Sequence, residues 1–397
     1  MQIAGIIAEY NPFHNGHAYQ IRTARAMGAT HIVAVMGGSF TQRGECAAVD
    51  KFTRARAALL GGADLIIELP LPYAVSSAER FAYGGVALLD ALGCVDTLVF
   101  GSECGDTNLL TAAAMAVDAP GLGDALKDYL NQGLVFPKAR QLALADTMGP
   151  AGAAVLEQPN NILGIEYIKW LLRIGSPIAP VTIARTGVGH ESEDTAGQIA
   201  SASLIRKRML GGDRWGDYVP PPSAALYTKA MAKGYAPCSL ARLERAVLAR
   251  LRTISRAELM TLPDVTEGLE GRIIKAAKTA ASLEELYLLI KSKRYTLSRI
   301  RRIVLCAFLG ISSELQLQSP PYLRVIGFNS RGKEILARAK ETARLPVLTG
   351  LARCAEVSEQ AARLAELESA ATDVFGLCSV QIRACSLDFT AKPVIIE

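Results

Sequence analysis

The chain has 397 residues, half of them hydrophobic, so it can bury a large core in two or three domains and lacks the composition of a disordered protein. No apolar run approaches the roughly 18 residues that a membrane span needs. The opening sequence MQIAGIIAEYNPF also lacks the basic start and small-residue cleavage site of a signal peptide, so a soluble, cytoplasmic protein without a membrane partner is expected.

The first 105 residues alternate short apolar runs with amphipathic stretches, which is the rhythm of a parallel α/β sheet. Strands are predicted at residues 3–9, 31–36, 63–69 and 97–101, and helices at 16–27, 50–61 and 77–92. Strands that are apolar on both faces belong inside a doubly wound parallel sheet of the Rossmann-like kind. A helix at 160–173, a strand at 178–184 and a helix at 202–210 complete a predicted catalytic domain over residues 1–215.

The segment Val219-Pro220-Pro221-Pro222 predicts a rigid, extended connector, because consecutive prolines oppose a helix. Residues 239–313 carry helical spacing almost free of strand signals, with breaks at Pro263 and Gly268, and predict a helical domain at 223–317. From residue 322 the pattern changes to strand 322–328, helix 332–343, strand 345–348 and helix 358–371. We expect a small α/β segment over residues 318–397.

The eight cysteines are scattered without a C-x-x-C pair, in a chain too large to need disulfide bonds, and buried thiols are predicted. Only four histidines are present and none lies near a cysteine pair. No metal site built from protein side chains is therefore predicted.

The first predicted strand and helix are joined by residues 9–17, Glu-Tyr-Asn-Pro-Phe-His-Asn-Gly-His. This loop lies at the carboxyl edge of the sheet, where ligands bind in such folds. Gly16 lets backbone approach a ligand closely, and the following helix offers free N–H groups to an anion. His14 and His17 can flank one phosphate and donate hydrogen bonds that strengthen as charge builds on its oxygens. The alternative is a pair of turn histidines without a function.

Polar residues also follow the other strands, at 37–44, at 101–103 and at Arg185-Thr186-Gly187. A further helix begins at residues 201–206, Ser-Ala-Ser-Leu-Ile-Arg. Its hydroxyl groups cap the helix at minimum, and with Arg206 they could hold a phosphate.

The runs at 14–17 and 201–206 resemble the H-x-G-H and S-S/T-x-x-I-R motifs of the nucleotidyltransferase superfamily, which bind ATP and promote attack on its α-phosphate. Residues 8–17, 42–45, 64–70, 100–103, 159–164 and 293–296 together resemble the tRNA(Met) cytidine acetate ligase family, over nearly the whole chain. The chain departs from the family pattern at Gln20, where many relatives have His, and at residues 189–191, so no role is assigned to His190.

That resemblance implies an ATP-dependent ligase that activates acetate as acetyl-adenylate and acetylates N4 of the wobble cytidine of elongator tRNA(Met), with Mg²⁺ accompanying pyrophosphate. It implies that His14 and His17 are catalytic. With the polar strand ends, it places ATP against Ile7, Ala8, Glu9, Tyr10, Asn11, Pro12, Phe13, His14, Asn15, Gly16, His17, Ala18, Tyr19, Gln20, Gly101, Asn160, Asn161, Arg185, Thr186, Ser203 and Arg206.

Positive charge is concentrated in the helical domain. Residues 240–302 hold 14 Lys and Arg against 7 Asp and Glu, a balance of +7 in a chain whose net charge is +5. Such clusters neutralise RNA phosphates, and an aromatic ring can stack on an unpaired base. The RNA-binding residues predicted within one 12-residue window are Lys291, Lys293, Arg294, Tyr295, Arg299, Arg301 and Arg302. A solvated helix face is the alternative.

A second hypothesis for the activity is a small-molecule nucleotidyltransferase that transfers adenylyl or cytidylyl groups without an RNA substrate. The first domain alone would suit it. The concentrated basic region argues against it, because such enzymes need no large surface for a polyanion.

Overall fold

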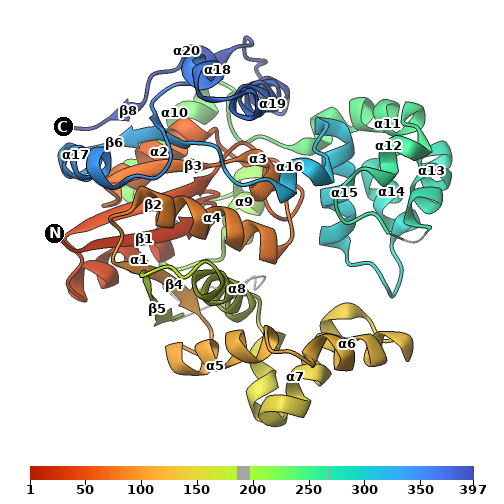
Figure 1. The fold of residues 1–397 in the computed structure, drawn as a ribbon. Coiled ribbons are helices and arrows are strands. Elements are labelled where there is room, and N and C mark those ends of the chain that lie inside the picture. Colours follow the sequence, from red (N-terminus) through yellow and green to blue (C-terminus); the bar gives the residue numbers. More distant parts are fainter. Residues whose placement is uncertain (186–196, 267) are drawn as a thin grey trace.

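The computed structural model describes residues 1–185, 197–266 and 268–397 and is built around one mixed β-sheet (Figure 1). The strand order is β5-β4-β1-β2-β3-β6-β7, and β8 pairs with β6. The strands are β1 Ile3–Ala8, β2 His31–Gly37, β3 Leu65–Leu69, β4 Thr97–Ser102, β5 Ala179–Ala184, β6 Leu323–Phe328, β7 Val347–Leu348 and β8 Val394–Ile395. Thr186, Gly187 and His190 lie outside the described residues.

Helices pack on both faces of this sheet, which confirms the doubly wound architecture. Ile3 and Ile7 of β1 face α4 and α8, whereas Ala4 and Ile6 face α1 and α2, because successive side chains of a strand point to opposite faces. The helices of this part are α1 Asn15–Ala26, α2 Lys51–Leu60, α3 Leu71–Ala74, α4 Ala78–Leu92, α5 Thr107–Val117, α6 Leu122–Asn131, α7 Phe136–Ala153, α8 Pro159–Arg173, α9 Ala202–Gly211 and α10 Pro221–Ala232.

The central strands β1 and β4 separate at their carboxyl ends. β1 pairs with β2 over six residues but with β4 only at Ala4 and Gly5. The chain runs from β1 to β2 and β3 on one side and then returns to β4 on the other, so the strand order reverses between β1 and β4. In such sheets, ligands bind in the crevice that this reversal leaves outside the carboxyl ends.

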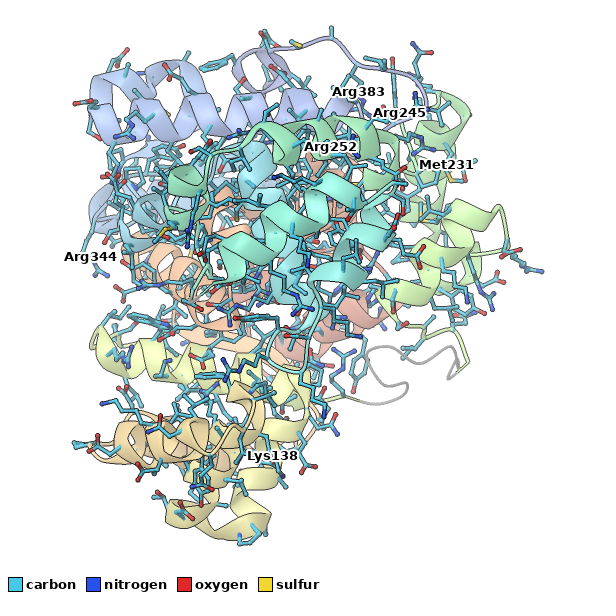
Figure 2. The ribbon with its side chains drawn as sticks, turned by 90° about the vertical axis from the view of Figure 1, so that its right-hand side faces the viewer. Lys138, Met231, Arg245, Arg252, Arg344 and Arg383 are labelled. Carbon is cyan, nitrogen blue, oxygen red and sulfur yellow. The ribbon has the colours of Figure 1, made fainter. Side chains whose placement is uncertain are left out.

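A group of helices lies to one side of the sheet, drawn in green and teal at the right of Figure 1, and it faces the viewer in Figure 2. It comprises α11 Glu244–Thr253, α12 Arg256–Met260, α13 Leu269–Thr279, α14 Leu283–Ile290, α15 Leu297–Leu309 and α16 Ser313–Leu317. Its core includes Phe40 and Cys46 from the loop after β2 and Phe375 from near the C-terminus. The predicted helical character is confirmed, and these helices are anchored to the sheet by buried contacts.

The C-terminal residues return to the sheet. Their helices are α17 Ser330–Thr342, α18 Cys354–Val357, α19 Glu359–Gly376 and α20 Leu387–Thr390. β6 runs antiparallel to β3, with Leu65 opposite Phe328, and β8 pairs with β6. The expected strand at 322–328 therefore exists, but it extends the N-terminal sheet and makes that sheet mixed rather than wholly parallel.

The segment of residues 219–222 forms the expected extended connector only in its first half, where Val219 and Pro220 have ψ values of 153° and 144°. Pro221 and Pro222 are the first two residues of α10. The first helical turn has no intrahelical N–H bond to lose, and the fixed φ of proline suits it, so prolines that break a helix interior can begin one. The helices α5 to α7 were not predicted, and the boundaries drawn at 215, 223 and 317 stay predictions.

The cysteines are all free thiols. Six are buried as predicted, but Cys104 is half-buried and Cys385 is exposed. Among the described helices, none is by itself long and apolar enough to cross a membrane; α5 and α6 reach that length and composition only as a pair, across a bend of 74°.

Candidate active site

A cavity of about 750 Å³ opens where β1 and β4 separate. Its volume is in the range of small-ligand sites, roughly 300–1,000 Å³. Fifteen predicted ATP-site residues line it, namely Ile7, Ala8, Glu9, Tyr10, Asn11, His14, Gly16, His17, Tyr19, Gln20, Gly101, Asn160, Arg185, Ser203 and Arg206. The structure thus brings together residues from the first loop, β4, α8, β5 and α9.

The two histidines form a stacked pair at the start of α1. Their ring centroids are 3.7 Å apart, with an interplanar angle of 25°. His14 Nδ1 accepts the N–H of Gly16 at 3.0 Å, and His17 Nδ1 accepts the N–H of His14 at 3.3 Å. A nitrogen that accepts an N–H carries no proton, so each neutral ring bears its proton on Nε2. This reciprocal cap therefore fixes both rings as Nε2–H donors.

The charge state of His17 follows from its surroundings. Burial lowers the pKa of His17 well below its ordinary value, and the electrostatic effects of the neighbouring His14 and Arg185 lower it further. The ring is neutral at neutral pH, so it offers a hydrogen-bond donor rather than a full charge. Tyr10 packs edge-on against His17, with centroids 4.8 Å apart, and restricts the orientation of the ring.

The loop between β1 and α1 is held in a strained conformation. Tyr10 has a φ of 47°, a left-handed value that costs a residue with a side chain about 1–2 kcal/mol. Asn11 ties the loop down, since its Oδ1 accepts the N–H of Ala48 at 2.8 Å and its carbonyl accepts Arg206 Nη1 at 2.9 Å. Strain that neighbouring contacts maintain is typical of functional loops.

Arg54 joins the carboxyl ends of β1 and β2. Its guanidinium is fully buried and donates to the carbonyls of Glu9 at 2.5 Å, Gly37 at 3.0 Å and Val49 at 2.8 Å, and also to that of Gly38. Arg54 therefore positions both strand ends without lining the cavity.

Glu9 is the only Asp or Glu among the described residues that line the cavity. Its Oε1 accepts the N–H of Gln42 at 2.7 Å. Burial raises the pKa of Glu9 above its ordinary value, although the Gln42 hydrogen bond and nearby arginines oppose that rise. Against this single carboxylate, the lining carries Arg43, Arg185, Arg206, Arg301 and Arg302, of which Arg301 and Arg302 are each paired with a carboxylate outside the lining. Such an excess of positive charge suits a polyphosphate.

The two predicted asparagines have different positions. Asn160 lines the cavity, and its Nδ2 donates to Glu103 Oε1 at 2.5 Å. Asn161 lies behind the lining, where its Oδ1 accepts the N–H groups of Glu103 at 2.9 Å and Cys104 at 3.1 Å. Asn161 therefore holds the loop after β4 against the start of α8.

Several predicted ATP residues do not line the cavity. Phe13 lies in the core, with its N–H donated to the Tyr227 hydroxyl at 3.1 Å. Asn15 donates to the carbonyls of Gln198 and Asp217 at 2.8 and 3.0 Å. The full set is Pro12, Phe13, Asn15, Ala18 and Asn161, and a direct contact between any of them and ATP stays a prediction.

Other lining residues were absent from the predicted site. Gln42 and Arg43 come from the polar run after β2, whose place at a strand end was a usable signal. Phe100 and Tyr167, with ring centroids 5.7 Å apart, belong to an apolar wall suited to a base, but their sequence patterns resemble ordinary core positions.

The predicted RNA-binding cluster divides into two parts. Arg301 and Arg302 of α15 line the active-site cavity, where Arg301 pairs with Glu45 at 2.5 Å and Arg302 pairs with Asp264 at 3.2 Å. Arg299 donates to the Asp264 carbonyl at 2.6 Å. Lys293, Arg294 and Tyr295 instead line a separate, open hollow on the helical side, and Lys291 is exposed beside it.

The loop after β2 packs directly on the backbone of α15 at Gly44. Its φ is +73°, and an added Cβ would lie 2.5 Å from Arg301 C and Arg302 N. We expect Gly44→Ala to separate the loop from α15, lowering the free energy of unfolding by more than the roughly 1–2 kcal/mol of left-handed strain alone.

Chemical unfolding measures the loss of stability, and ATP turnover measures the effect on the cavity. Gly123→Ala is the control, because Gly123 lies in α6 with nothing within 4 Å of an added Cβ. That change should be neutral or stabilise by about 0.5–1 kcal/mol. Equal stabilities of the two variants would contradict close packing at Gly44.

Comparison with known proteins agrees with this geometry. A model of the family described as HIGH Nucleotidyl Transferase matches residues 1–387. The chain is 42% identical to the tRNA(Met) cytidine acetate ligase of Thermoanaerobacter sp. (strain X514), covering 98% of both, and 40% identical to that of Caldicellulosiruptor saccharolyticus, covering 100% of this chain and 99% of the relative.

Solved structures are similar over the full length. The apo form of Thermotoga maritima TmcAL has a TM-score of 0.94, and a form bound with alpha-thio ATP has a TM-score of 0.92; each is 33% identical and covers 100% of both chains. Together with the paired His14 and His17, these matches show that the chain belongs to the tRNA(Met) cytidine acetate ligase family of HIGH nucleotidyl transferases.

Proposed function

We propose that the chain binds ATP in the cavity between β1 and β4, forms acetyl-adenylate from acetate and acetylates N4 of the wobble cytidine of elongator tRNA(Met). The observation that carries this proposal is the pair of Nε2–H donors on His14 and His17, in a cavity whose lining is strongly positive. The names of the relatives and the alpha-thio ATP of the structural neighbour support the choice of substrates. A tRNA substrate also supports a cytoplasmic location.

Adenylation solves a problem of reactivity, because acetate is a poor electrophile. One acetate oxygen attacks the α-phosphorus of ATP, the bond from that phosphorus to the bridging oxygen breaks, and pyrophosphate leaves. His14 and His17 donate hydrogen bonds to phosphoryl oxygens whose charge grows in the transition state. In the second step N4 attacks the acetyl carbon, AMP leaves, and the amine loses a proton.

Mg²⁺ would accompany the polyphosphate and help to neutralise it. In the described part of the chain, no group of three or more His, Cys, Asp or Glu side chains is placed to hold a metal ion. With Glu9 as the one carboxylate on the described lining, phosphate oxygens and water would supply most of the ligands.

A small-molecule nucleotidyltransferase is the weaker alternative. The relatives are named as tRNA ligases, and the helical region contributes Arg301 and Arg302 to the cavity itself. One assay separates the two: the protein is incubated with ATP and labelled acetate, with and without elongator tRNA(Met). The proposal requires acetyl-AMP in both samples and N4-acetylcytidine only with tRNA. Failure to form acetyl-AMP would contradict it.

Arg206 provides a test of the positive lining. Its Nη1 holds the Asn11 carbonyl at 2.9 Å, and its side chain also lines the cavity. We expect Arg206→Ala to raise the KM for ATP and lower kcat, with kcat/KM falling roughly 10- to 100-fold, since a charged hydrogen bond contributes about 1.5–3 kcal/mol.

Steady-state kinetics of acetate-dependent pyrophosphate release measure this effect. Lys229→Ala removes an exposed cation of α10 as a control and should change neither constant. A change in thermal stability alone would limit residues 201–206 to capping α9, where Ser201 Oγ accepts the Leu204 N–H at 3.1 Å.

A further inference from the structure

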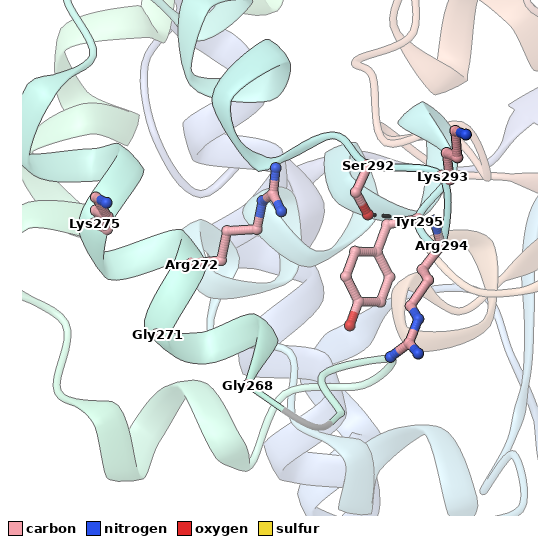
Figure 3. A pocket seen from close by; sticks show the side chains of 8 residues that line it. All are labelled: Gly268, Gly271, Arg272, Lys275, Ser292, Lys293, Arg294 and Tyr295. Atoms are coloured by element: carbon pink, nitrogen blue, oxygen red, sulfur yellow. Dashed lines mark hydrogen bonds between the residues drawn. The ribbon is translucent and has the colours of Figure 1, made fainter. Parts of the chain in front are cut away.

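A second cavity, of about 580 Å³, lies on the helical region between the start of α13 and the turn that precedes α15 (Figure 3). We call it the α13 hollow. It is lined by Gly268, Gly271, Arg272, Lys275, Ser292, Lys293, Arg294 and Tyr295. Arg272 and Lys275 were not among the predicted RNA-binding residues.

The lining of the α13 hollow is positive. It carries four cationic side chains, and among the described residues no Asp or Glu lines it. Arg272 is fixed in place, because its guanidinium donates to the carbonyls of Leu289 at 3.2 Å and Lys291 at 2.9 Å. The hollow therefore concentrates positive potential at one point, which suits a phosphate group.

The backbone on one side of the α13 hollow is uncovered. Gly268 begins α13 without a side-chain cap, and nothing lies within 4 Å of a Cβ added at Gly268 or Gly271. A ligand can thus approach the main chain closely at these two glycines, while the first-turn N–H groups of Gly268 and Glu270 are bonded to the Glu270 carboxylate.

Among the described residues that line the hollow, Tyr295 is the one with an aromatic ring. The Arg299 guanidinium lies 5.2 Å from its ring centroid, and Arg299 is itself anchored to Thr266 Oγ1 at 3.0 Å. The tight turn is closed by Ser292, whose carbonyl accepts the Tyr295 N–H and whose Oγ accepts the Arg294 N–H, each at 3.3 Å. Figure 3 shows the ring between Arg272 and Arg294. The ring is therefore a fixed platform beside cations from two elements.

We propose that the α13 hollow holds one unpaired nucleotide of the RNA substrate. Arg272, Lys275 and Arg294 neutralise its phosphate, and Tyr295 stacks on its base. This inference rests on the proposed function. Leu297, only two residues beyond Tyr295, lines the active-site cavity, so one short segment connects the two cavities. A strand held at the hollow is thereby directed along α15 toward the ATP site.

The first test removes charge from residues outside the predicted cluster. The double variant Arg272→Gln/Lys275→Gln should bind an elongator tRNA(Met) transcript about tenfold or more weakly. Its plot of log affinity against log salt should be shallower by roughly 1.4, because each lost contact to a single strand removes about 0.7 from the slope. Lys278→Gln is the matched control, since Lys278 is an exposed cation of the same helix outside the hollow.

The second test separates stacking from charge. Tyr295→Leu should weaken tRNA binding by roughly 5- to 100-fold without changing the salt slope, whereas Tyr295→Phe should bind as tightly as the unmodified protein. Acetyl-AMP formation without RNA should persist in every variant, because the hollow lies outside the ATP cavity.

Three results would overturn the inference. The double variant could match Lys278→Gln in its affinity for tRNA and in its salt slope. It could keep its affinity for tRNA and lose its binding of inorganic pyrophosphate. It could also lose acetyl-AMP formation together with tRNA binding. Failure of the proposed function is distinct, because the unmodified protein would then form no acetyl-AMP or bind no tRNA.

Discussion

Replacing either His14 or His17 by Ala should lower acetate-dependent pyrophosphate release by about 100- to 1,000-fold, the effect of losing one preorganised donor to a developing oxyanion. The reason lies in the geometry: both Nδ1 atoms accept backbone N–H groups, so each ring carries its proton on Nε2, the atom that would donate to the α-phosphoryl oxygens. A labelled-pyrophosphate assay with single-turnover controls measures the loss.

His14 also caps α1, so a sharper variant separates catalysis from folding. Asn is among the strongest helix caps, and His14→Asn should therefore keep the cap, whereas Ala loses about 1 kcal/mol. Asn cannot place a donor where Nε2 lies. His14→Asn should then unfold like the unmodified protein yet be as inactive as His14→Ala. Normal turnover in either folded variant would remove the histidines from the mechanism.

The start of the chain was the most predictable part of the fold and of the site. Apart from His31 and Glu68, both faces of β1 to β3 are apolar, so their runs of Ile, Val and Leu mark buried parallel strands. The active-site loop follows β1 directly, and a polar run that breaks such a strand is visible in the sequence alone. Local patterns carry this information because the contacts that matter are close in sequence.

Contacts between distant segments were less predictable. Arg301 and Glu45 are 256 residues apart in sequence, and nothing around Arg301 distinguishes a cation that faces the cavity from one that faces solvent. The position of β6 was equally hard to predict, because its apolar run is compatible with a separate C-terminal sheet and with an antiparallel position beside β3. The position of each is decided by tertiary packing rather than by the local pattern.

A buried group of four charges holds the C-terminal segment on the sheet. We expect this group to dominate the stability of that segment's attachment. Lys51 Nζ lies 2.7 Å from carboxylate oxygens of Glu68 and Asp388, and Arg324 contacts the same two carboxylates at 2.6 and 2.7 Å. All four side chains are at most 4% exposed. The group is neutral as a whole, so each charge depends on the others.

Asp388→Asn should lower the free energy of unfolding by about 3–5 kcal/mol, because it leaves buried positive charge without compensation. Burial raises the pKa of Asp388, but Lys51 and Arg324 more than offset that rise and hold the pKa below its ordinary value. The unfolded state then binds the proton more tightly than the folded state. The stabilisation is therefore present above the ordinary carboxyl pKa and lost as the pH falls toward the lowered folded-state value.

Urea unfolding at neutral pH and at falling pH measures both effects. Asp124→Asn is the matched control, since Asp124 pairs with Lys127 at 3.6 Å on the surface and is 85% exposed. That change should cost less than about 1 kcal/mol. The difference in unfolding free energy between the two variants should shrink as the pH falls, because acid protonates the Asp388 that the Asp124→Asn variant retains. If Asp388→Asn cost no more than Asp124→Asn, the four charges would not hold the C-terminal segment in place, and the apolar contacts of β6 would have to do so.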